Sequence, residues 1–452
     1  MFGFLKVLIF ISMLLVPVSL FAKFMGPTYL PAERLIANTL AYLKEHPDSH
    51  ETLYALARIH YLAFINQSDL VGAYNDGKPP RIAPDWILGD YLSYARSEQA
   101  QKLALKELGL KSYQDITKER HAEYYTLLQV KLKKLIDEKW QPEKISQEAL
   151  LNHGKEAVIH FKKALAIEPN NALYHLGLAC FYHQYLNYKK TTELKKEPTE
   201  LKEITLEKAL DFYYKAYSLS IEDEIKSEYQ PKSGLNSLVS FEAGNAFLQI
   251  TDQINTLSKK ILSAEERKKN EEISKNISKL KALPQGAVTP IIFTLENQVS
   301  ISELLNPDLN VNFDLDGNGS AELWPWVKST TGFLVWDPQA KGKITSGRQM
   351  FGSVTWWIFF KNGYQALDSL DDNRDGQISD EELIGITTWF DKNGNGISEA
   401  SEMIDLKTLG VVSIGTKPTG ETSGMPMHDG GITLINGKTL CTYDRTTLPY
   451  KK

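Results

Sequence analysis

The stretch DDNRDGQISDEE, residues 371–382, places acidic and amide side chains at alternate positions before a central glycine and ends on a glutamate. In a tightly turning loop the first, third and fifth side chains converge on one side of the backbone, and a glycine at the sixth place takes a positive φ without strain. The seventh residue offers its backbone carbonyl and the twelfth both carboxylate oxygens, which completes an oxygen shell for a calcium ion. The stretch therefore predicts a calcium site with the ligands Asp371, Asn373, Asp375, Gln377 and Glu382.

The other residues of this loop have supporting roles in the same pattern. Ile378 is expected to tie the loop to a short pairing strand, Ser379 to act through a water molecule, and Glu382 to begin an outgoing helix. A polar turn that only caps a helix is the alternative interpretation. The glutamate at the twelfth place favours the metal site, because a capping turn does not require it.

A second loop with the same frame spans residues 391–402. Its predicted ligands are Asp391, Asn393, Asn395 and Glu402, with Gly396 at the sixth place. The apolar anchor, Ile397, occupies the seventh place instead of the eighth, so the pairing strand is less clearly defined. This loop supplies fewer carboxylates than the first unless Glu399 joins, so we expect the second site to bind calcium more weakly.

The two loops begin 20 residues apart (391 − 371). The segment between them, residues 381–390, is therefore expected to form both the exit helix of the first loop and the entering helix of the second. A calcium sensor lobe has two helices between its loops, and it opens a hydrophobic groove when the ion binds. The short spacing excludes that arrangement and predicts a structural role for calcium, in which the ion orders the fold.

Two further acidic segments lack a complete ligand set. The turn DLDGNG, residues 314–319, begins like a calcium loop, but Pro325 stands at its twelfth place. Residues 337–344 keep the frame of a calcium loop, with Lys341 at a ligand position. Because a lysine ammonium repels a cation, we interpret this second segment as a lost site.

The segment from residue 31 to about residue 283 is rich in Leu, Ala, Glu, Lys and Tyr at helical spacing, which predicts an all-helical region. Small and aromatic residues recur in it with the spacing of a helix-pair repeat: Ala157, Phe161, Ala164 and Pro169, then Leu178, Ala179 and Tyr182, then Ala209, Tyr213 and Ala216, then Ala243, Gly244 and Phe247. This pattern resembles tetratricopeptide repeats, although residues 85–147 match no repeat. The resemblance implies an all-α helical solenoid whose concave surface binds a protein or an extended peptide. The alternative to a binding surface is that the stacked helices only space and support the C-terminal part.

After residue 290, short apolar runs at residues 291–293 and 311–313 predict strands. Residues 289–445 contain, in order, TPIIF, FDLDGNG, GFLVWD, GKITSG, MFG, NGYQAL, DDNRDGQISDEEL, WFDKNGNGISEASE, LKTLGVVSI and TYD. This series is similar to the EF-hand-type calcium-binding module of secreted bacterial proteins, some of which also carry RTX repeats. The resemblance implies a compact mixed α+β domain built around calcium loops, without an active site. Gln349, in place of an expected acid, and Arg445, in place of a tryptophan, depart from the series.

Together these patterns predict a multidomain chain. Residues 1–22 combine Lys6 with an apolar run, as in a signal peptide, although an uncleaved membrane anchor is the alternative. Residues 23–283 are expected to form the helical domain, residues 284–290 a linker, and residues 291–452 the calcium-binding α+β domain. No later stretch is apolar enough for a membrane span. We expect the protein to be exported, to the periplasm, the cell surface or the medium.

Composition limits the remaining functions. After position 290 there are 21 acidic and 13 basic residues, and the basic residues of the chain are dispersed, which argues against nucleic-acid binding. Cys180 and Cys441 lie in different predicted domains, so we expect two free thiols. The histidines of the helical part are assigned to separate helices or loops without accompanying cysteines or acids, and we interpret them as packing or solvated residues: His46, His50, His153, His160, His175 and His183.

The sequence favours a binding protein over an enzyme. It contains no G-x-S-x-G, no H-E-x-x-H and no phosphate-binding glycine loop, and its paired acids are already assigned to calcium. We therefore expect a non-enzymatic, exported calcium-binding protein whose helical part contacts a protein or peptide. The alternatives are a calcium-stabilised extracytoplasmic hydrolase and a module that docks a partner through its calcium loops.

Overall fold

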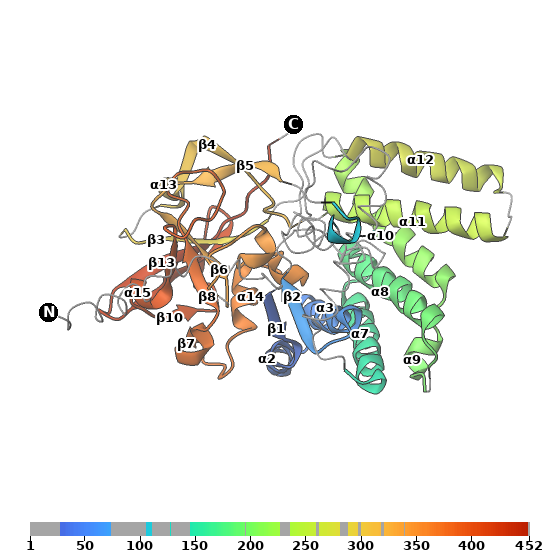
Figure 1. Ribbon diagram of the computed structural model, residues 1–452, viewed down its shortest axis with the longest axis horizontal. Helices are drawn as coiled ribbons and strands as arrows, with labels where there is room; N and C mark the ends of the chain where they lie inside the picture. The colour runs from blue at the N-terminus through green and yellow to red at the C-terminus, as the bar shows by residue number, and fades with distance from the viewer. Residues whose placement is uncertain are drawn as a thin grey trace.

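The computed structural model describes residues 28–73, 105–110, 127, 145–194, 196–226, 236–258, 262–280, 288–296, 300–317, 321–338 and 340–450. Within this part, helices occupy the N-terminal half and a curled antiparallel sheet occupies the C-terminal half, as Figure 1 shows. This arrangement confirms the predicted order of a helical part followed by a part that contains strands. The predicted signal peptide, residues 1–22, and most of residues 85–147 and 284–290 lie outside the described residues.

The helical part is a series of helices in which each long helix packs against the next one along the described chain. Its helices are α2 (Ala32–Glu45), α3 (His50–Asn66), α7 (Gln147–Ile167), α8 (Ala172–Thr191), α9 (Thr199–Lys202), α10 (Leu206–Lys226), α11 (Asn236–Ser258) and α12 (Ala264–Leu280). Beside this series lies a two-stranded antiparallel sheet, formed by β1 (Thr28–Pro31) and β2 (Leu70–Ala73). The helices α2 and α3 connect its two strands. In Figure 1 these strands and α2 lie between the long helices and the sheet.

Local sequence explains where these helices begin and how closely they pack. The side chains of Ser49 and Asn171 accept a backbone N–H in the first turns of α3 and α8, which caps both helices. A Cβ atom on Gly177 would lie 2.7 Å from a ring carbon of Phe161 and 2.9 Å from one of Tyr54, so glycine allows α3, α7 and α8 to meet. The helical prediction is confirmed, and the tetratricopeptide type of these helices stays a prediction.

The C-terminal part is organised by one nine-stranded sheet with the order β7-β10-β12-β13-β3-β6-β8-β9, while β11 pairs with β12. Its strands are β3 (Ile291–Thr294), β6 (Thr331–Trp336), β7 (Gln377–Ser379), β8 (Ile386–Trp389), β9 (Met403–Asp405), β10 (Val411–Gly415), β11 (Gly420–Thr422), β12 (Met425–Leu434) and β13 (Thr439–Asp444). All of these neighbours are antiparallel. The two edges of this order are therefore β7 and β9.

Short elements surround the sheet. A separate antiparallel pair is formed by β4 (Leu305–Phe313) and β5 (Glu322–Val327). The helices and 3-10 turns of this half are α13 (Ile301–Leu304), η3 (Gly347–Gln349), η4 (Thr355–Trp357), α14 (Gly363–Asp368), η5 (Asp380–Leu383) and α15 (Leu406–Leu409). The strands predicted at residues 291–293 and 311–313 are confirmed, since they fall in β3 and β4.

Three clusters of buried apolar side chains make up the core of the described residues. One cluster runs without interruption from the first helices into the sheet, with Leu35 and Tyr54 on the helical side and Leu367 and Ile378 on the sheet side. A second cluster contains Trp324, Trp326 and Trp389, and a third fills the space among α8, α10, α11 and α12. The two halves of the chain therefore share part of their hydrophobic core.

The predicted helix over residues 381–390 is wrong. Asp380–Leu383 form the single 3-10 turn η5, and the chain then enters β8, which pairs with β6 and β9. The strand residues Ile386–Trp389 read ITTW, and β-branched and aromatic side chains of this kind fit a pleated surface. Trp389 is completely buried against the tryptophan cluster, so tertiary packing fixes this segment as a strand.

Two other features bear on the sequence-based expectations. None of the described helices is both long and apolar enough to cross a membrane. Cys180 and Cys441 are free thiols, as predicted, and burial raises the pKa of Cys180 to about 11. The described residues are thus held together by packing and hydrogen bonds.

Candidate metal centre

The first predicted loop, residues 371–382, begins after α14 and ends in η5, with β7 inside it. Its fourth and sixth residues, Arg374 and Gly376, have positive φ values of 63° and 86°. A Cβ atom on Gly376 would meet nothing within 4 Å, so φ alone favours glycine there. Ile378 is buried in β7 and pairs with Ile414 of β10, which confirms the short pairing strand expected at the eighth place.

The polar side chains of the loop accept hydrogen bonds from its backbone N–H groups. The Gly376 N–H donates to Asp371 Oδ2 at 2.9 Å, and the Asp375 N–H donates to Asn373 Oδ1 at 2.8 Å. The Gln377 N–H donates to Asp375 Oδ1 at 2.9 Å. Turns of this kind give the loop the tight backbone that the sequence predicts, while Asn373 and Asp375 remain exposed.

Glu382 folds back over the beginning of the loop. Its Oε1 atom accepts the N–H groups of Asp372 and Asn373 at 2.7 Å and 3.1 Å, and its Oε2 atom accepts the Ser379 N–H at 3.0 Å. The residue is 7% exposed. The twelfth residue is therefore brought to the first three residues of the loop, although it lies in a 3-10 turn and not in the predicted helix.

Asp371 provides the test of whether the loop fits a cation. The residue is 1% exposed, and its Oδ1 atom has no hydrogen-bond partner among the residues that the structure describes. Burial raises the pKa of Asp371 above its usual range. A buried carboxylate oxygen without a partner is costly, and a cation among the loop oxygens would compensate it. The donor set consists of oxygens alone, which suits calcium.

The second predicted loop, residues 391–402, connects β8 to β9 within the sheet. Its fourth and sixth residues, Gly394 and Gly396, both have φ values of 70°, which repeats the positive φ values at these two places in the first loop. A Cβ atom on Gly396 would overlap the side chain of Val311 in β4. The two loops thus share their backbone turn, but the second is packed against a neighbouring strand.

Hydrogen bonds in the second loop are more complete than in the first. Asp391 Oδ1 accepts the N–H groups of Gly394 and Asn395 at 2.8 Å and 3.1 Å. Its Oδ2 atom accepts the N–H of Gly396 at 2.9 Å and the indole N–H of Trp326 at 2.7 Å. Because both oxygens of Asp391 are occupied, this loop has less need of a cation than the first.

The remaining predicted ligands of the second loop also converge. The Ile397 N–H donates to Asn395 Oδ1 at 2.7 Å, and the Asn395 N–H donates to Asn393 Oδ1 at 3.1 Å. Glu402 is 1% exposed and accepts the Lys392 N–H at 2.8 Å. The side-chain amides of both asparagines donate to Glu399, at 3.1 Å and 3.3 Å, so Glu399 contributes to the loop by orienting them.

The segment interpreted as a lost site lies against the second loop. The N–H groups of Lys341 and Gly342 donate to Asp337, at 3.1 Å and 2.6 Å, while residue 339 lies outside the described residues. Ser398 joins the two segments, since its hydroxyl donates to the Gly342 carbonyl and accepts the Ile344 N–H. Ser398 stands at the eighth place, so this contact takes the position of the pairing that Ile378 makes in the first loop.

An acidic cluster that the sequence pattern did not complete lies at the turn between β4 and β5. Carboxylate oxygens of Asp314, Asp316 and Glu322 lie within 4.8 Å of one another. Glu322 stands at the ninth place of this turn, whereas the calcium-loop pattern expects its last acidic ligand at the twelfth. Arg348, fully buried on Trp357, donates from Nε to the Gly317 carbonyl at 2.7 Å. A guanidinium beside this turn offsets part of its negative charge.

The histidines of the helical part are closer together than expected. The assignment of His153 and His160 to separate elements is wrong, since both lie on α7, and there they meet His60 of α3. His60 Nδ1 lies 2.9 Å from His153 Nδ1, and His153 Nε2 lies 2.9 Å from Asp69 Oδ1. Within the described part of the chain these histidines do not reach the mutual spacing that a shared metal ion requires.

Two comparisons with known proteins each match part of the chain. Part of this chain is similar to the iron-regulated protein FrpA of Neisseria meningitidis serogroup C, at 36% identity over 107 residues. These residues are 23% of this chain and 10% of the relative, so the chain spans about a tenth of that protein's length. Residues 296–442, which include both predicted calcium loops, match the family model described as the SPM domain.

Proposed function

We propose that this protein binds calcium through residues 371–382, and more weakly through residues 391–402, and that the ion stabilises the C-terminal domain. The observation that carries the proposal is the buried Asp371 carboxylate, whose Oδ1 atom has no hydrogen-bond partner in the described structure. A divalent cation supplies the positive charge that would compensate this buried carboxylate. The chemistry of the site is then oxygen coordination by an EF-hand-like loop, without a reaction.

The same proposal includes an exported, non-enzymatic protein whose helical part presents a surface to a protein or peptide. The support for export is the apolar N-terminal stretch with its preceding lysine, together with calcium loops that suit calcium-rich surroundings outside the cell. The support for a partner is the series of packed helices, an architecture that often holds extended peptides.

Calorimetric titration of the purified chain with calcium chloride tests the metal site. We expect a stronger and a weaker binding event, and we expect Glu382→Gln to remove the stronger one, because the neutral amide contributes one oxygen and no charge. Asp391→Ala should remove the weaker one. Glu381→Gln is the matched control, since Glu381 is the exposed neighbour of Glu382 and its substitution changes the formal charge equally.

Thermal unfolding gives an independent readout of the same proposal. A ligand that binds only the folded chain stabilises it by about 2.7 kcal/mol when its concentration is 100 times the dissociation constant. We therefore expect the melting temperature of the wild-type chain to rise with calcium and that of Glu382→Gln to rise much less. Absence of both titration heat and a calcium-dependent melting temperature in the wild-type chain contradicts the proposed function.

A further inference from the structure

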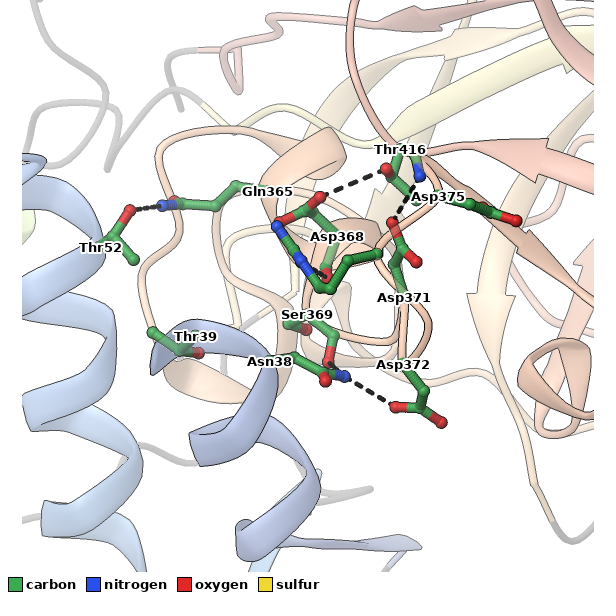
Figure 2. A network of polar contacts seen from close by, with 12 residues as sticks. Asn38, Thr39, Thr52, Gln365, Asp368, Ser369, Asp371, Asp372, Asp375 and Thr416 are labelled. Atoms are coloured by element: carbon green, nitrogen blue, oxygen red, sulfur yellow. Dashed lines mark hydrogen bonds and ion pairs between the residues drawn. The ribbon is translucent and has the colours of Figure 1, made fainter. Parts of the chain in front are cut away.

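The first helix of the N-terminal half, α2, lies directly against the first calcium loop. Asn38 of α2 donates from Nδ2 to the Ser369 carbonyl at 2.9 Å and to Asp372 Oδ1 at 2.7 Å. Arg34 donates from Nη2 to the Leu370 carbonyl at 2.9 Å and from Nε to Asp372 Oδ1 at 2.8 Å. Figure 2 shows Asn38 pointing from the helix to Ser369 and Asp372, which precede and follow Asp371 along the chain.

Asp372 connects the helix to the metal-binding loop through two different groups. Its side chain receives hydrogen bonds from α2, and its backbone N–H donates to Glu382 Oε1 at 2.7 Å. Asp372 is the second residue of the loop, so its side chain is not among the predicted ligands. The residue therefore holds the Glu382 carboxylate on one side and the helical half of the chain on the other.

Arg374, the fourth residue of the loop, makes a second set of contacts that hold the loop in place. Arg374 donates from Nη1 to the carbonyl and the carboxylate of Asp368, at 3.1 Å and 2.9 Å, and its guanidinium carbon lies 5.7 Å from the ring centre of Tyr42 in α2. The Thr416 hydroxyl donates to the other Asp368 oxygen at 3.3 Å, and the Thr416 N–H donates to the Gly376 carbonyl at 3.0 Å. The loop is thus held from α2 and from the sheet together.

We propose that α2 is the positioning element of the calcium loop, and that calcium in turn tightens the attachment of the helical half to the C-terminal half. This inference rests on the proposed calcium binding at residues 371–382. Asn38 and Arg34 fix the carbonyls just before Asp371 and the side chain just after it, so they hold the first ligand in place. Coupling between two sites is reciprocal, and metal binding therefore protects α2 as much as α2 favours metal binding.

Asn38 and Arg34 differ in how clearly they test this coupling. Arg34 carries a positive charge near the loop, so its removal weakens the positioning but also makes the surroundings more negative, which attracts a cation. These two effects oppose each other. Asn38 is neutral and 5% exposed, and its removal leaves the charge unchanged. The substitution Asn38→Ala therefore isolates the positioning effect.

The test is calcium titration of the full chain carrying Asn38→Ala, with Thr39→Val as the matched control. Thr39 is the next residue of α2, is also buried, and donates its hydroxyl to Leu35 within the helix, so it does not hold the loop. We expect Asn38→Ala to weaken the stronger calcium event about 5- to 10-fold, at the lower end of typical coupling between sites. We expect Thr39→Val to leave the dissociation constant within about twofold.

Hydrogen exchange of the wild-type chain, measured with and without calcium, provides a second readout that needs no substitution in α2. Peptides covering residues 32–45 should exchange more slowly with calcium than with chelator, and Glu382→Gln should abolish this difference. If the wild-type chain binds calcium while Asn38→Ala binds equally well and α2 exchange is unchanged, the positioning role is wrong and the proposed function stands. If the wild-type chain does not bind calcium, the proposed function itself fails.

Discussion

At the scale of the residue, the sixth place of each loop is a glycine for different physical reasons. Gly376 has a φ of 86° and open space where a side chain would project. Gly396 has a φ of 70°, but a side chain there would overlap Val311 of β4. The backbone alone requires glycine in the first loop, whereas backbone and packing both require it in the second.

The two glycines therefore predict unequal costs for the same substitution. We expect Gly376→Ala to lower the free energy of unfolding by about 1 kcal/mol, since only the left-handed backbone is strained. Gly396→Ala should cost about 3 kcal/mol, because the overpacking against Val311 is added. Urea unfolding in the presence of chelator measures both values without a contribution from bound metal. Equal costs in the two variants contradict the packing of the second loop against β4.

Residues within each loop were predictable from sequence because their chemistry repeats at fixed short spacing. The turns that the side chains of Asp371, Asn373 and Asp375 stabilise follow from that spacing and are present in the structure. Asn38 could not be found in this way, since it lies 334 residues from Asp372 and no local pattern connects the two. Glu322 could not be predicted, because the calcium-loop pattern places its last acidic ligand at the twelfth position and Glu322 stands at the ninth.

At the scale of the element, α3 and α7 enclose a buried histidine cluster in their interface. His60 and His160 stack with ring centres 6.0 Å apart, and His60 faces His153. Burial and the neighbouring His153 and His160 lower the pKa of His60 to about 3. A proton on this cluster would place positive charge in the interface between the two helices.

This cluster predicts a loss of stability in acid. Unfolded His60 takes up a proton as the pH falls below about 6.5, but the folded chain does so only near pH 3. The contribution of His60 is therefore fully present above about pH 6.5 and decreases below it, by up to about 1.4 kcal/mol for each pH unit. We expect His60→Gln to flatten the dependence of the urea midpoint on pH between 6.5 and 4.

His46→Gln serves as the control for this experiment. His46 is exposed at the end of α2, away from the cluster, so its substitution should leave the pH profile of the wild-type chain unchanged. The interpretation of a buried neutral His60 is wrong if His60→Gln and wild-type chains show parallel profiles. Both series are measured without calcium, because metal binding itself depends on pH.

The element types were predictable wherever local pattern and packing agree. Apolar runs at residues 291–293 and 311–313 predict β3 and β4, and helical spacing predicts the N-terminal helices. The exception is β8, because the pattern of two successive calcium loops predicts a helix for the segment between them. The ITTW segment instead completes the sheet between β6 and β9, because burial of Trp389 in the tryptophan cluster outweighs the template.

At the scale of the whole molecule, the helices and the sheet are joined by shared core and by buried polar contacts. Arg58 of α3 donates to the Trp357 carbonyl at 2.8 Å, and its guanidinium lies 5.1 Å from the ring centre of Phe359. Gln365 donates to the Thr52 hydroxyl at 3.1 Å, as Figure 2 shows. The change in sequence composition near residue 290 does not reveal this interface, since its partners are far apart along the chain.

Shared core predicts cooperative unfolding of the two halves. Six of the eight tryptophans lie after residue 290, so fluorescence reports mainly on the sheet, whereas circular dichroism at 222 nm reports mainly on the helices. We expect the two signals to change at the same urea concentration, because one hydrophobic cluster spans both halves. Two separated midpoints contradict this prediction and assign the halves to independent folding units.

The two predicted calcium loops lie at opposite edges of the nine-stranded sheet, since β7 belongs to the first loop and β9 follows the second. Edge strands expose unpaired backbone groups that can recruit strands from other molecules. If calcium binds as proposed, each ion would hold in place the strand at the adjoining edge. Its removal would then expose both edges of the sheet to intermolecular strand addition, so bound calcium would also protect the fold against aggregation.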